Sequence, residues 1–379
     1  MKVLDFKNFE IRTILSRNFD YLLFGIILAL YTFSVLSLYS YSSQILFQKQ
    51  LVWCSVGVLL YLIVSRLDIS FLQNSKLVMI VYIISNLLLL YTVFFGATIN
   101  GAKAWINLGL FSFQPADLAK ISIVLLLAKY FSKRHIEIQF LRHIAVSLLY
   151  TSVPVFLIML QPDFGSAMAT MSIWFFVVFM SGLSKKHLFI MFLLGFASVI
   201  LMWNFVFADY QKNRVFNFIN PTRDVRGSGY NVHQAFIAIG SGGLYGKGVG
   251  LGSQSKFNFL PEYQTDFIFS AYAEEWGFVG VVIILFLYFA FLSRLIYLAH
   301  YARDNFASLF SLGVFAWAFV HVFVNISMNL GLFPVTGIPL PFMSYGGSHI
   351  ILLTLAVAIV SSLVKVNFRN KISSDFVAY

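Results

Sequence analysis

The chain of 379 residues is 59% hydrophobic and only 11% charged, whereas soluble globular domains carry roughly 25% charged residues. This composition excludes an ordinary soluble domain, although the formal net charge of +11 would by itself suit a nucleic-acid partner. The sequence therefore predicts an all-α integral membrane protein.

Ten apolar runs follow one another along the chain, and several exceed the roughly 18 residues that can span a bilayer. We therefore expect about ten transmembrane helices in a single polytopic membrane domain, residues 1–379, with no soluble domain. The runs lie at residues 20–42, 49–65, 75–95, 117–131, 143–160, 165–183, 187–207, 267–293, 305–327 and 347–364.

Before the first run, residues 1–19 form a basic tail. The apolar run that follows is too long for a signal-peptide core, so we interpret it as a retained anchor. The tail either lies flat on the inner leaflet or is loosely ordered, and the sequence leaves both open. Cys54 in the second run is the only cysteine, which excludes an internal disulfide and a cysteine-based metal site.

The basic residues are distributed unevenly over the loops. With the N-terminus placed in the cytoplasm, 17 of the 26 Lys and Arg residues fall on the inner side, together with 7 of the 15 acids. An excess of Lys and Arg in short cytoplasmic loops sets membrane orientation. The pattern predicts that both termini are cytoplasmic, and it argues against nucleic acid as a partner.

Three longer segments are predicted on the outer side: residues 96–116, a large extracellular loop at 208–265, and residues 329–345. The last segment is mostly apolar but contains three prolines, which break helices. Irregular backbone at membrane depth is tolerated only where protein buries it or where it lines a wet cavity. We expect a re-entrant segment beside a cavity, and an ordinary surface loop is the alternative.

The large loop contains a glycine-rich stretch at residues 240–252, with Lys247 inside it. Backbone N–H groups of such stretches can converge on an anion. No strand–turn–helix unit surrounds the glycines, so the stretch is not a nucleotide-binding fingerprint. An anion-binding nest and a flexible hinge both remain open.

Three outward-facing acids are candidates for chemistry. Asp266 stands where the large loop meets the eighth run, and Glu274 and Glu275 follow within the next helical turns. Asp163 lies between the fifth and sixth runs, and Asp117 lies at the mouth of the fourth. Acids at membrane depth are costly and usually face a cavity or a pathway. For Asp117 and Asp163, helix capping is the competing interpretation.

Basic residues near these acids suggest a phosphorylated substrate. Lys120 follows Asp117 by three residues and therefore shares its helix face. Lysine side chains of this kind, Lys103 included, would attract a diphosphate. Carboxylates could hold a divalent cation, Mg²⁺ or Mn²⁺, against it, with Asp266, Glu262 and Asp117 as candidate ligands. No organic cofactor is expected.

Several motifs, taken together, resemble those of the SEDS family (shape, elongation, division and sporulation). The resemblance covers most of the chain, from residue 100 to residue 348. The motifs lie at residues 100–102 with 105–106, 113–115, 161–165, 239–243, 259–262 with 265–269 and 274–275, 334–341 and 344–348.

The resemblance implies a peptidoglycan glycosyltransferase of the bacterial plasma membrane that polymerises lipid II on the outer face. It implies Asp266 as the catalytic aspartate. It further implies a class B penicillin-binding protein as partner and, in the elongation branch, MreC and MreD; the short tail and the residues around 253–262 favour that branch over the division branch. The predicted substrate-binding residues are Trp105, Lys120, Lys103, Glu262, Asp163, Asp117 and Ser344.

Three positions depart from the family pattern. Ala104 stands where a basic residue is usual, Ala116–Asp117 where Ser–Glu is usual, and His349 where Ser is usual.

The chemistry of such a substrate needs few protein groups. A polyprenyl diphosphate is already a good leaving group, so one general base for the acceptor hydroxyl is sufficient. We assign Asp266 as that base, and Lys120 and Lys103 as candidates for neutralising the diphosphate. An apolar groove for the lipid tail is expected close to Asp266. A lipid II flippase and a non-catalytic scaffold are the rival hypotheses.

Overall fold

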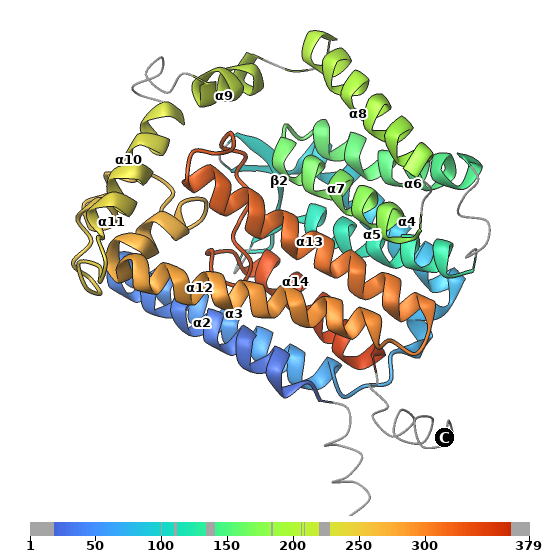
Figure 1. The fold of residues 1–379 in the computed structure, drawn as a ribbon, viewed down its shortest axis with the longest axis horizontal. Helices are drawn as coiled ribbons and strands as arrows, with labels where there is room; N and C mark the ends of the chain where they lie inside the picture. Colours follow the sequence, from blue (N-terminus) through green and yellow to red (C-terminus); the bar gives the residue numbers. More distant parts are fainter. Residues whose placement is uncertain are drawn as a thin grey trace, which may run out of the picture.

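The computed structural model describes residues 19–99, 101–109, 112–133, 141–182, 185–205, 207, 209–219 and 228–364. Nearly all of the predicted tail at 1–19 lies outside these residues. The described part is dominated by helices (Figure 1). They are α2 (Tyr21–Tyr41), α3 (Gln44–Val64), η1 (Ser70–Gln73), α4 (Ser75–Phe95), α5 (Pro115–Ser132), α6 (Leu141–Met159), α7 (Phe164–Met180), α8 (Lys185–Phe205), α9 (Asp209–Ile219), α10 (Ser228–Ser241), α11 (Ser253–Lys256), α12 (Ile268–His300), α13 (Asn305–Asn329) and α14 (Gly347–Leu363).

Each of the ten predicted apolar runs coincides with one helix, from α2 to α8 and from α12 to α14. In the described ranges, six of them (α2, α3, α4, α6, α12 and α13) are long and apolar enough to cross a membrane, and α7 and α14 are shorter apolar helices. The all-α membrane fold is therefore confirmed. The number of crossings stays a prediction.

Local sequence signals explain where several helices begin. The side chains of Asp20, Asp163 and Asp304 accept hydrogen bonds from backbone N–H groups three residues further on, and they thereby cap α2, α7 and α13. Pro115 occupies the first turn of α5, where its missing N–H costs nothing. Helix α12 is interrupted at Gly277, whose φ of 64° lies in the left-handed region that favours glycine.

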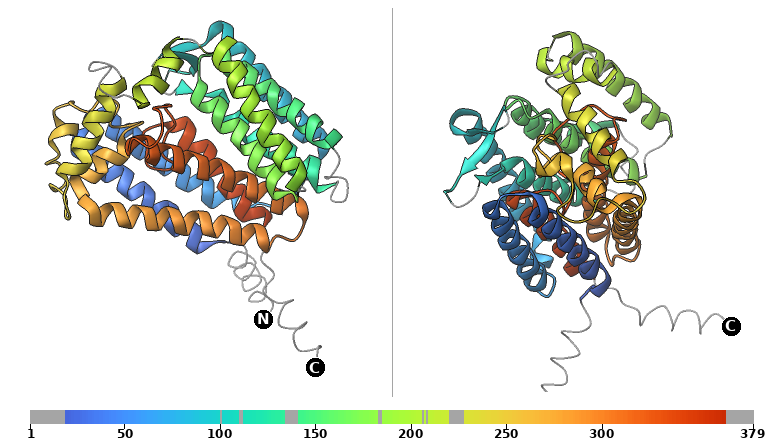
Figure 2. Two further views of the ribbon diagram at one scale, coloured as in Figure 1. Left: turned by 45° about the horizontal axis from the view of Figure 1, so that its top comes forward. Right: turned by 90° about the vertical axis from the view of Figure 1, so that its left-hand side faces the viewer.

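Helix α13 lies at the centre of the bundle, where it packs against α5, α7, α12 and α14 and is mostly buried. The start of α2 and the end of α14 lie at one end of the bundle, and α10 and α11 lie at the other (Figures 1 and 2). An ion pair between Asp20 and Arg294, with an O–N distance of 2.8 Å, joins α2 to α12 at the first of these ends.

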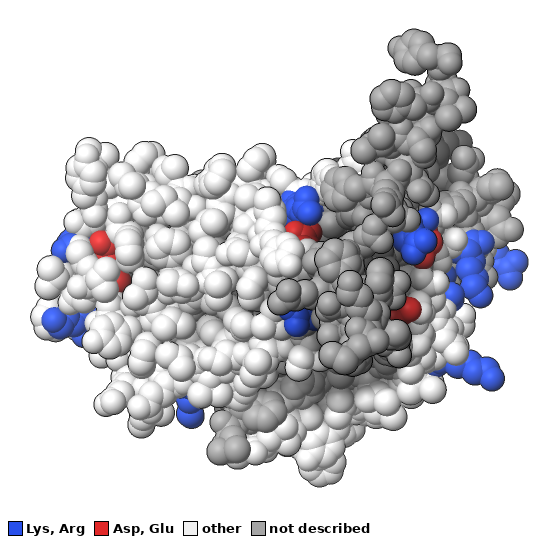
Figure 3. All heavy atoms as spheres, turned by 90° about the horizontal axis from the view of Figure 1, so that it is seen from below, with Lys and Arg blue, Asp and Glu red and all other residues white. Residues whose placement is uncertain are grey.

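The outer surface of the bundle suits a lipid environment. Large apolar side chains are exposed on several helices, among them Ile63, Phe94, Phe286 and Phe289. Figure 3 shows a wide zone between the charges at the left edge and those near the middle of this face, with a basic group at its lower border. Charges gather where the headgroups of a bilayer would lie.

Two of the segments predicted on the outer side contain more regular structure than the sequence indicated. Residues 96–116 were expected to be a loop, but they form a three-stranded antiparallel sheet with β1 (Ala97–Ile99), β2 (Ala102–Asn107) and β3 (Ser112–Phe113). The strands are too short for their alternation to stand out in the sequence. The predicted large loop at 208–265 contains α9, α10 and α11. By contrast, residues 330–346 form turns and irregular backbone between α13 and α14.

Candidate active site

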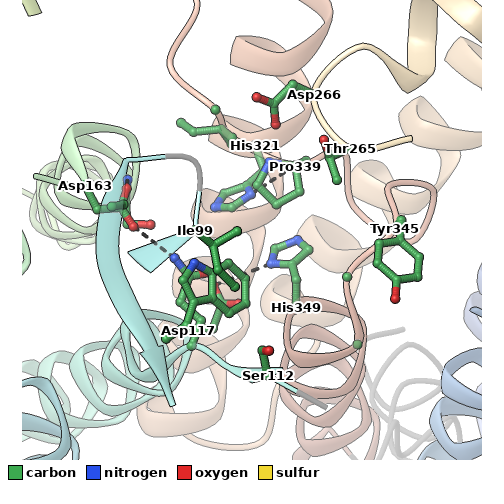
Figure 4. Close-up of a pocket in the computed structure, with 18 of the residues that line it drawn as sticks. Ile99, Ser112, Asp117, Asp163, Thr265, Asp266, His321, Pro339, Tyr345 and His349 are labelled. Atoms are coloured by element: carbon green, nitrogen blue, oxygen red, sulfur yellow. Dashed lines mark hydrogen bonds and ion pairs between the residues drawn. The ribbon is translucent and has the colours of Figure 1, made fainter. Parts of the chain in front are cut away.

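A polar cavity of about 510 Å³ lies among the sheet, the irregular segment 330–346, and helices α5, α7 and α13 (Figure 4). Five predicted site residues line it: Asp266, Trp105, Lys120, Asp163 and Asp117. Lys103, Glu262 and Ser344 do not line it, although all three lie in the described part of the chain. The structure thus brings together residues that are as far apart in sequence as Trp105 and Asp266.

The backbone that carries Asp266 is held from two sides. The amide groups of Asn325 and Asn329, one helical turn apart on α13, both donate to the carbonyl oxygen of Asp266, at 3.0 and 2.9 Å. The Ser344 hydroxyl donates to the Thr265 carbonyl at 2.6 Å, and the Tyr345 N–H donates to the Gln264 carbonyl at 2.8 Å. Three consecutive carbonyls are therefore anchored, which fixes the direction of the Asp266 side chain.

The Asp266 carboxyl group has the protonation behaviour of a general base. Its pKa is raised to about 7: burial raises it most, the nearby Glu262 and Asp163 carboxylates also raise it, and the Arg214 guanidinium opposes this. A general base works best when its pKa lies near the operating pH. Asp266 lies two residues before the first residue of α12, at the cavity wall.

Glu262 does not line the cavity, but its charge acts on Asp266. Its backbone has a φ of 51°, and its carbonyl accepts hydrogen bonds from the N–H groups of Thr265 and Phe267. Its carboxylate accepts the Thr265 hydroxyl at 2.9 Å. Glu262 therefore shapes the turn before α12 and adds negative charge near Asp266, whereas the sequence predicted that it binds substrate directly.

At another part of the cavity wall, Asp117 and Lys120 form a buried ion pair on α5, with an O–N distance of 2.8 Å. Both residues are only 1% exposed. His349 on α14 lies beside the pair, with its Nδ1 atom 3.5 Å from the Asp117 carboxylate. The shared helix face predicted for Asp117 and Lys120 thus brings their charges together, and Asp117 does not cap α5 with its side chain.

His321 on α13 stacks on His349, with ring centroids 4.7 Å apart and planes 11° from parallel. The indole N–H of Trp317, which can only donate, bonds to Nε2 of His321 at 3.1 Å. Nε2 must therefore carry a lone pair, so the proton sits on Nδ1, which is 3.2 Å from the Pro339 carbonyl. These two bonds hold His321 in its neutral form.

Asp163 combines capping with a position in the cavity wall. One carboxylate oxygen accepts the Ser166 N–H at 3.0 Å and caps α7. The other accepts the Gln114 side-chain amide at 2.9 Å, a bond that is visible in Figure 4. Asp163 therefore caps α7 and also lines the cavity, and its role toward a substrate stays a prediction.

Two predicted substrate-binding residues lie elsewhere. The Lys103 ammonium group donates to the Phe94 carbonyl at 2.7 Å, at the end of α4, so it does not face the cavity. Ser344 is buried, and its hydroxyl is occupied by the Thr265 carbonyl and the Leu340 N–H. Spacing along the sequence could not reveal either outcome, because both depend on where the neighbouring segments fold.

The glycine-rich stretch lies against a carboxylate of the protein, that of Glu274. The Glu274 carboxylate accepts the Lys247 ammonium at 2.7 Å and the Gln254 N–H at 3.1 Å. Gly246 approaches the backbone of α12 so closely that a Cβ there would lie 2.0 Å from the Glu275 carbonyl oxygen. Glu274 and Glu275 therefore bind this loop to α12, and neither lines the cavity.

The structure adds residues to the site that the sequence did not single out. Arg214, His321 and His349 line the cavity, and Asn325 and Asn329 support Asp266. His349 was noted only as a departure from the family pattern. The one available signal was the placement of three polar residues, His321, Asn325 and Asn329, at a spacing of four in an otherwise apolar helix.

The candidate metal ligands do not form a protein metal site. The Asp117 carboxylate pairs with the Lys120 ammonium group, and the Glu262 carboxylate accepts a hydrogen bond from the Thr265 hydroxyl. Among the described residues, no group of three or more His, Cys, Asp or Glu side chains could hold a metal ion. Asp266, Glu262 and Asp117 therefore do not form a three-ligand cluster, and the divalent cation stays a prediction.

Known proteins are similar to this chain in sequence and in fold. The chain is 37% identical over 340 residues to the peptidoglycan glycosyltransferase MrdB of Escherichia coli K12. This alignment covers 89% of the chain and 91% of MrdB. Its fold matches a chain from a structure of a peptidoglycan synthase complex that coordinates polymerization and crosslinking, with a TM-score of 0.79 at 32% identity, over 93% and 99% of the two chains. It also matches the rod shape determining protein RodA of Thermus thermophilus, with a TM-score of 0.69 at 32% identity, over 93% and 98% of the chains.

The family comparison covers most of the chain. The model of the FtsW, RodA and SpoVE cell cycle proteins matches residues 12–368, a range that includes the cavity and every residue around it. The chain is therefore a multi-pass membrane protein of the FtsW/RodA/SpoVE family of cell cycle proteins.

Proposed function

We propose that this chain is a peptidoglycan glycosyltransferase that polymerises lipid II into glycan strands, with Asp266 as its general base. The observation that carries the proposal is a carboxyl group with a pKa of about 7, fixed by its backbone at the wall of a polar cavity. The activity named for MrdB supports the same chemistry.

The proposed reaction has one proton transfer and one displacement. Asp266 accepts the proton of the acceptor sugar hydroxyl while that oxygen attacks the anomeric carbon of the donor sugar. The bond between this carbon and the diphosphate oxygen breaks, and the polyprenyl diphosphate leaves with the bonding electron pair. Inversion at the anomeric carbon follows from a single displacement.

Negative charge that develops on the leaving diphosphate needs cations nearby. Lys49, Lys120 and Arg214 line the cavity, whereas Lys103 does not, so it is withdrawn as a candidate. A divalent cation, Mg²⁺ or Mn²⁺, stays a proposal. The diphosphate oxygens would have to supply most of its ligands, because the described residues offer no three-ligand cluster.

The lipid tail needs an apolar surface. A second cavity of about 550 Å³ lies between α2 and α3 and is lined mainly by apolar side chains, including Leu28, Val35 and Leu59. Helix α3 borders both cavities, because its residue Trp53 lines the polar cavity. We assign this groove as the site for a polyprenyl tail.

We further propose that the chain works in the bacterial plasma membrane with both termini in the cytoplasm, so that the cavity faces outward. A class B penicillin-binding protein would supply crosslinking, as the peptidoglycan synthase complex of similar fold suggests. MreC and MreD would be additional partners if the chain serves cell elongation, the branch that the sequence motifs favour.

The direct test uses full-length purified protein with lipid II, with and without its transpeptidase partner, and separates glycan chains by size. Asp266→Asn should lower polymerisation by about 10²–10⁴-fold, the usual contribution of a general base. Its thermal unfolding midpoint should not fall, because an amide avoids the cost of burying a charge. Wild-type amounts of glycan from Asp266→Asn would refute the assignment.

The same preparation distinguishes the rival functions. A flippase would move fluorescent lipid II across liposome membranes without forming glycan, and a scaffold would do neither. Because the cavity gathers its charged groups around one site, one-sided chemistry is the expected result.

A further inference from the structure

The cations around the cavity differ in where they lie. Lys120 is 1% exposed and bonds to Asp117 at 2.8 Å, so its charge is balanced inside the protein. Lys49 is exposed near the start of α3. Arg214 instead projects from α9, in the outer segment of the chain, into the same cavity that Asp266 lines.

Arg214 is anchored close to Asp266. Its Nη1 atom donates to the Val335 carbonyl at 3.2 Å, which ties α9 to the irregular segment 330–346. Two residues further along this segment, Gly337 lies against Asp266, and a Cβ built there would be 3.6 Å from the Asp266 carboxylate. The guanidinium group is therefore held on the same short piece of backbone that borders the general base.

The local charge balance makes a cation necessary for an anionic ligand. Asp266 and Asp163 line this cavity, and the Glu262 carboxylate bonds to Thr265, which also lines it. A diphosphate that approached these carboxylates would be repelled unless a cation met it. A guanidinium group offers five N–H donors in a fixed plane, a geometry that binds two phosphate oxygens at once.

We propose that Arg214 binds the diphosphate of the prenyl-linked saccharide, which makes α9 part of the substrate site. This inference rests on the proposed function, since it names the group that recognises the leaving diphosphate of that reaction. The ligand chemistry is a prenyl diphosphate, and the phosphate of an anionic phospholipid is the other possible source of the same charge.

The test measures binding without turnover. Full-length protein that carries Asp266→Asn is titrated with farnesyl diphosphate in neutral detergent, and Arg214→Ala is added to this background. Because Arg214→Ala removes charge-assisted hydrogen bonds, it should lower the affinity for farnesyl diphosphate by ~10- to 100-fold. Arg214→Lys keeps the charge but loses the planar fork, so its affinity for farnesyl diphosphate should lie between that of the parent and that of Arg214→Ala.

Lys212→Ala is the matched control, because Lys212 carries the same charge two residues earlier on α9 and does not line the cavity. Its affinity for farnesyl diphosphate should stay within about twofold of the parent, a change of less than ~0.5 kcal/mol. An equal loss in Lys212→Ala and Arg214→Ala would mean that only the overall charge matters, and it would overturn the proposal.

Two further outcomes decide against the proposal. One is unchanged affinity for farnesyl diphosphate in both Arg214→Ala and Arg214→Lys. The other is a loss confined to phosphatidylglycerol, measured in mixed micelles, which would assign Arg214 to a lipid headgroup. The proposed function fails separately, through glycan synthesis by Asp266→Asn, so the two failures are distinguishable.

Discussion

Asn329 donates its side-chain amide to the backbone carbonyl of Asp266 at 2.9 Å, from the last residue of α13 to the residue that precedes the first turn of α12. The other end of the same amide accepts the Ser270 N–H at 3.2 Å. One side chain therefore joins the central helix to the backbone on both sides of the α12 start. The position of the proposed base depends on this helix as much as on its own sequence neighbours.

Asn329→Asp should lower kcat by roughly 10- to 100-fold and leave KM for lipid II nearly unchanged, because a small displacement of a reacting group has effects of this size. The substitution keeps the acceptor for Ser270 and replaces the donor to Asp266 with an oxygen atom. Steady-state polymerisation kinetics give the two constants.

The control is Asn86→Asp on α4, where the same amide-to-carbonyl bond, 2.8 Å to Tyr82, is lost away from the cavity. Its kcat should match that of the wild type. An equal loss of kcat in both variants, or a change in KM alone, would show that Asn329 does not position the base.

The rate should rise with pH and reach half of its maximum near pH 7, because only the deprotonated Asp266 can accept a proton and burial raises its pKa to about 7. Glu262 raises that pKa, so Glu262→Gln should move the profile to lower pH. Arg214 lowers it, so Arg214→Ala should move the profile to higher pH. Profiles of kcat against pH for the three proteins provide the check, and shifts in the same direction for both variants would contradict it.

Asp117→Asn should destabilise the protein by about 3–5 kcal/mol, because it leaves the buried Lys120 ammonium without its 2.8 Å partner. The double variant Asp117→Leu/Lys120→Met removes both charges and should unfold at a higher temperature than Asp117→Asn. Thermal unfolding in detergent measures this difference. If the double variant is less stable than Asp117→Asn, the Asp117–Lys120 ion pair stabilises the fold by more than its desolvation costs.

Gly246→Ala should lower the unfolding midpoint more than Gly250→Ala. Both glycines have positive φ, 81° and 78°, so both substitutions introduce a similar backbone strain. Only at residue 246 would the new Cβ collide with backbone, since the nearest atom to a Cβ at residue 250 lies 3.8 Å away. Equal midpoints would indicate that the loop moves away from α12 without cost.

The sequence by itself determined the membrane fold class, the positions of the apolar helices, and Asp266, Asp117 and Lys120 as residues of interest. These follow from local properties: apolar runs long enough to form helices, the cost of charges at membrane depth, and the three-residue spacing that places two side chains on one helix face.

Only the tertiary structure decided which polar groups meet. It placed Arg214 and His349 in the cavity wall, turned Lys103 toward the Phe94 carbonyl, and assigned Ser344 to the backbone of Thr265. The Lys103 contact depends on how β2 packs against the end of α4, and the other outcomes depend on how α9, α14 and the irregular segment 330–346 pack around the cavity. The physical reason is that a hydrogen bond between residues dozens of positions apart is set by the packing of whole helices, which no local pattern records.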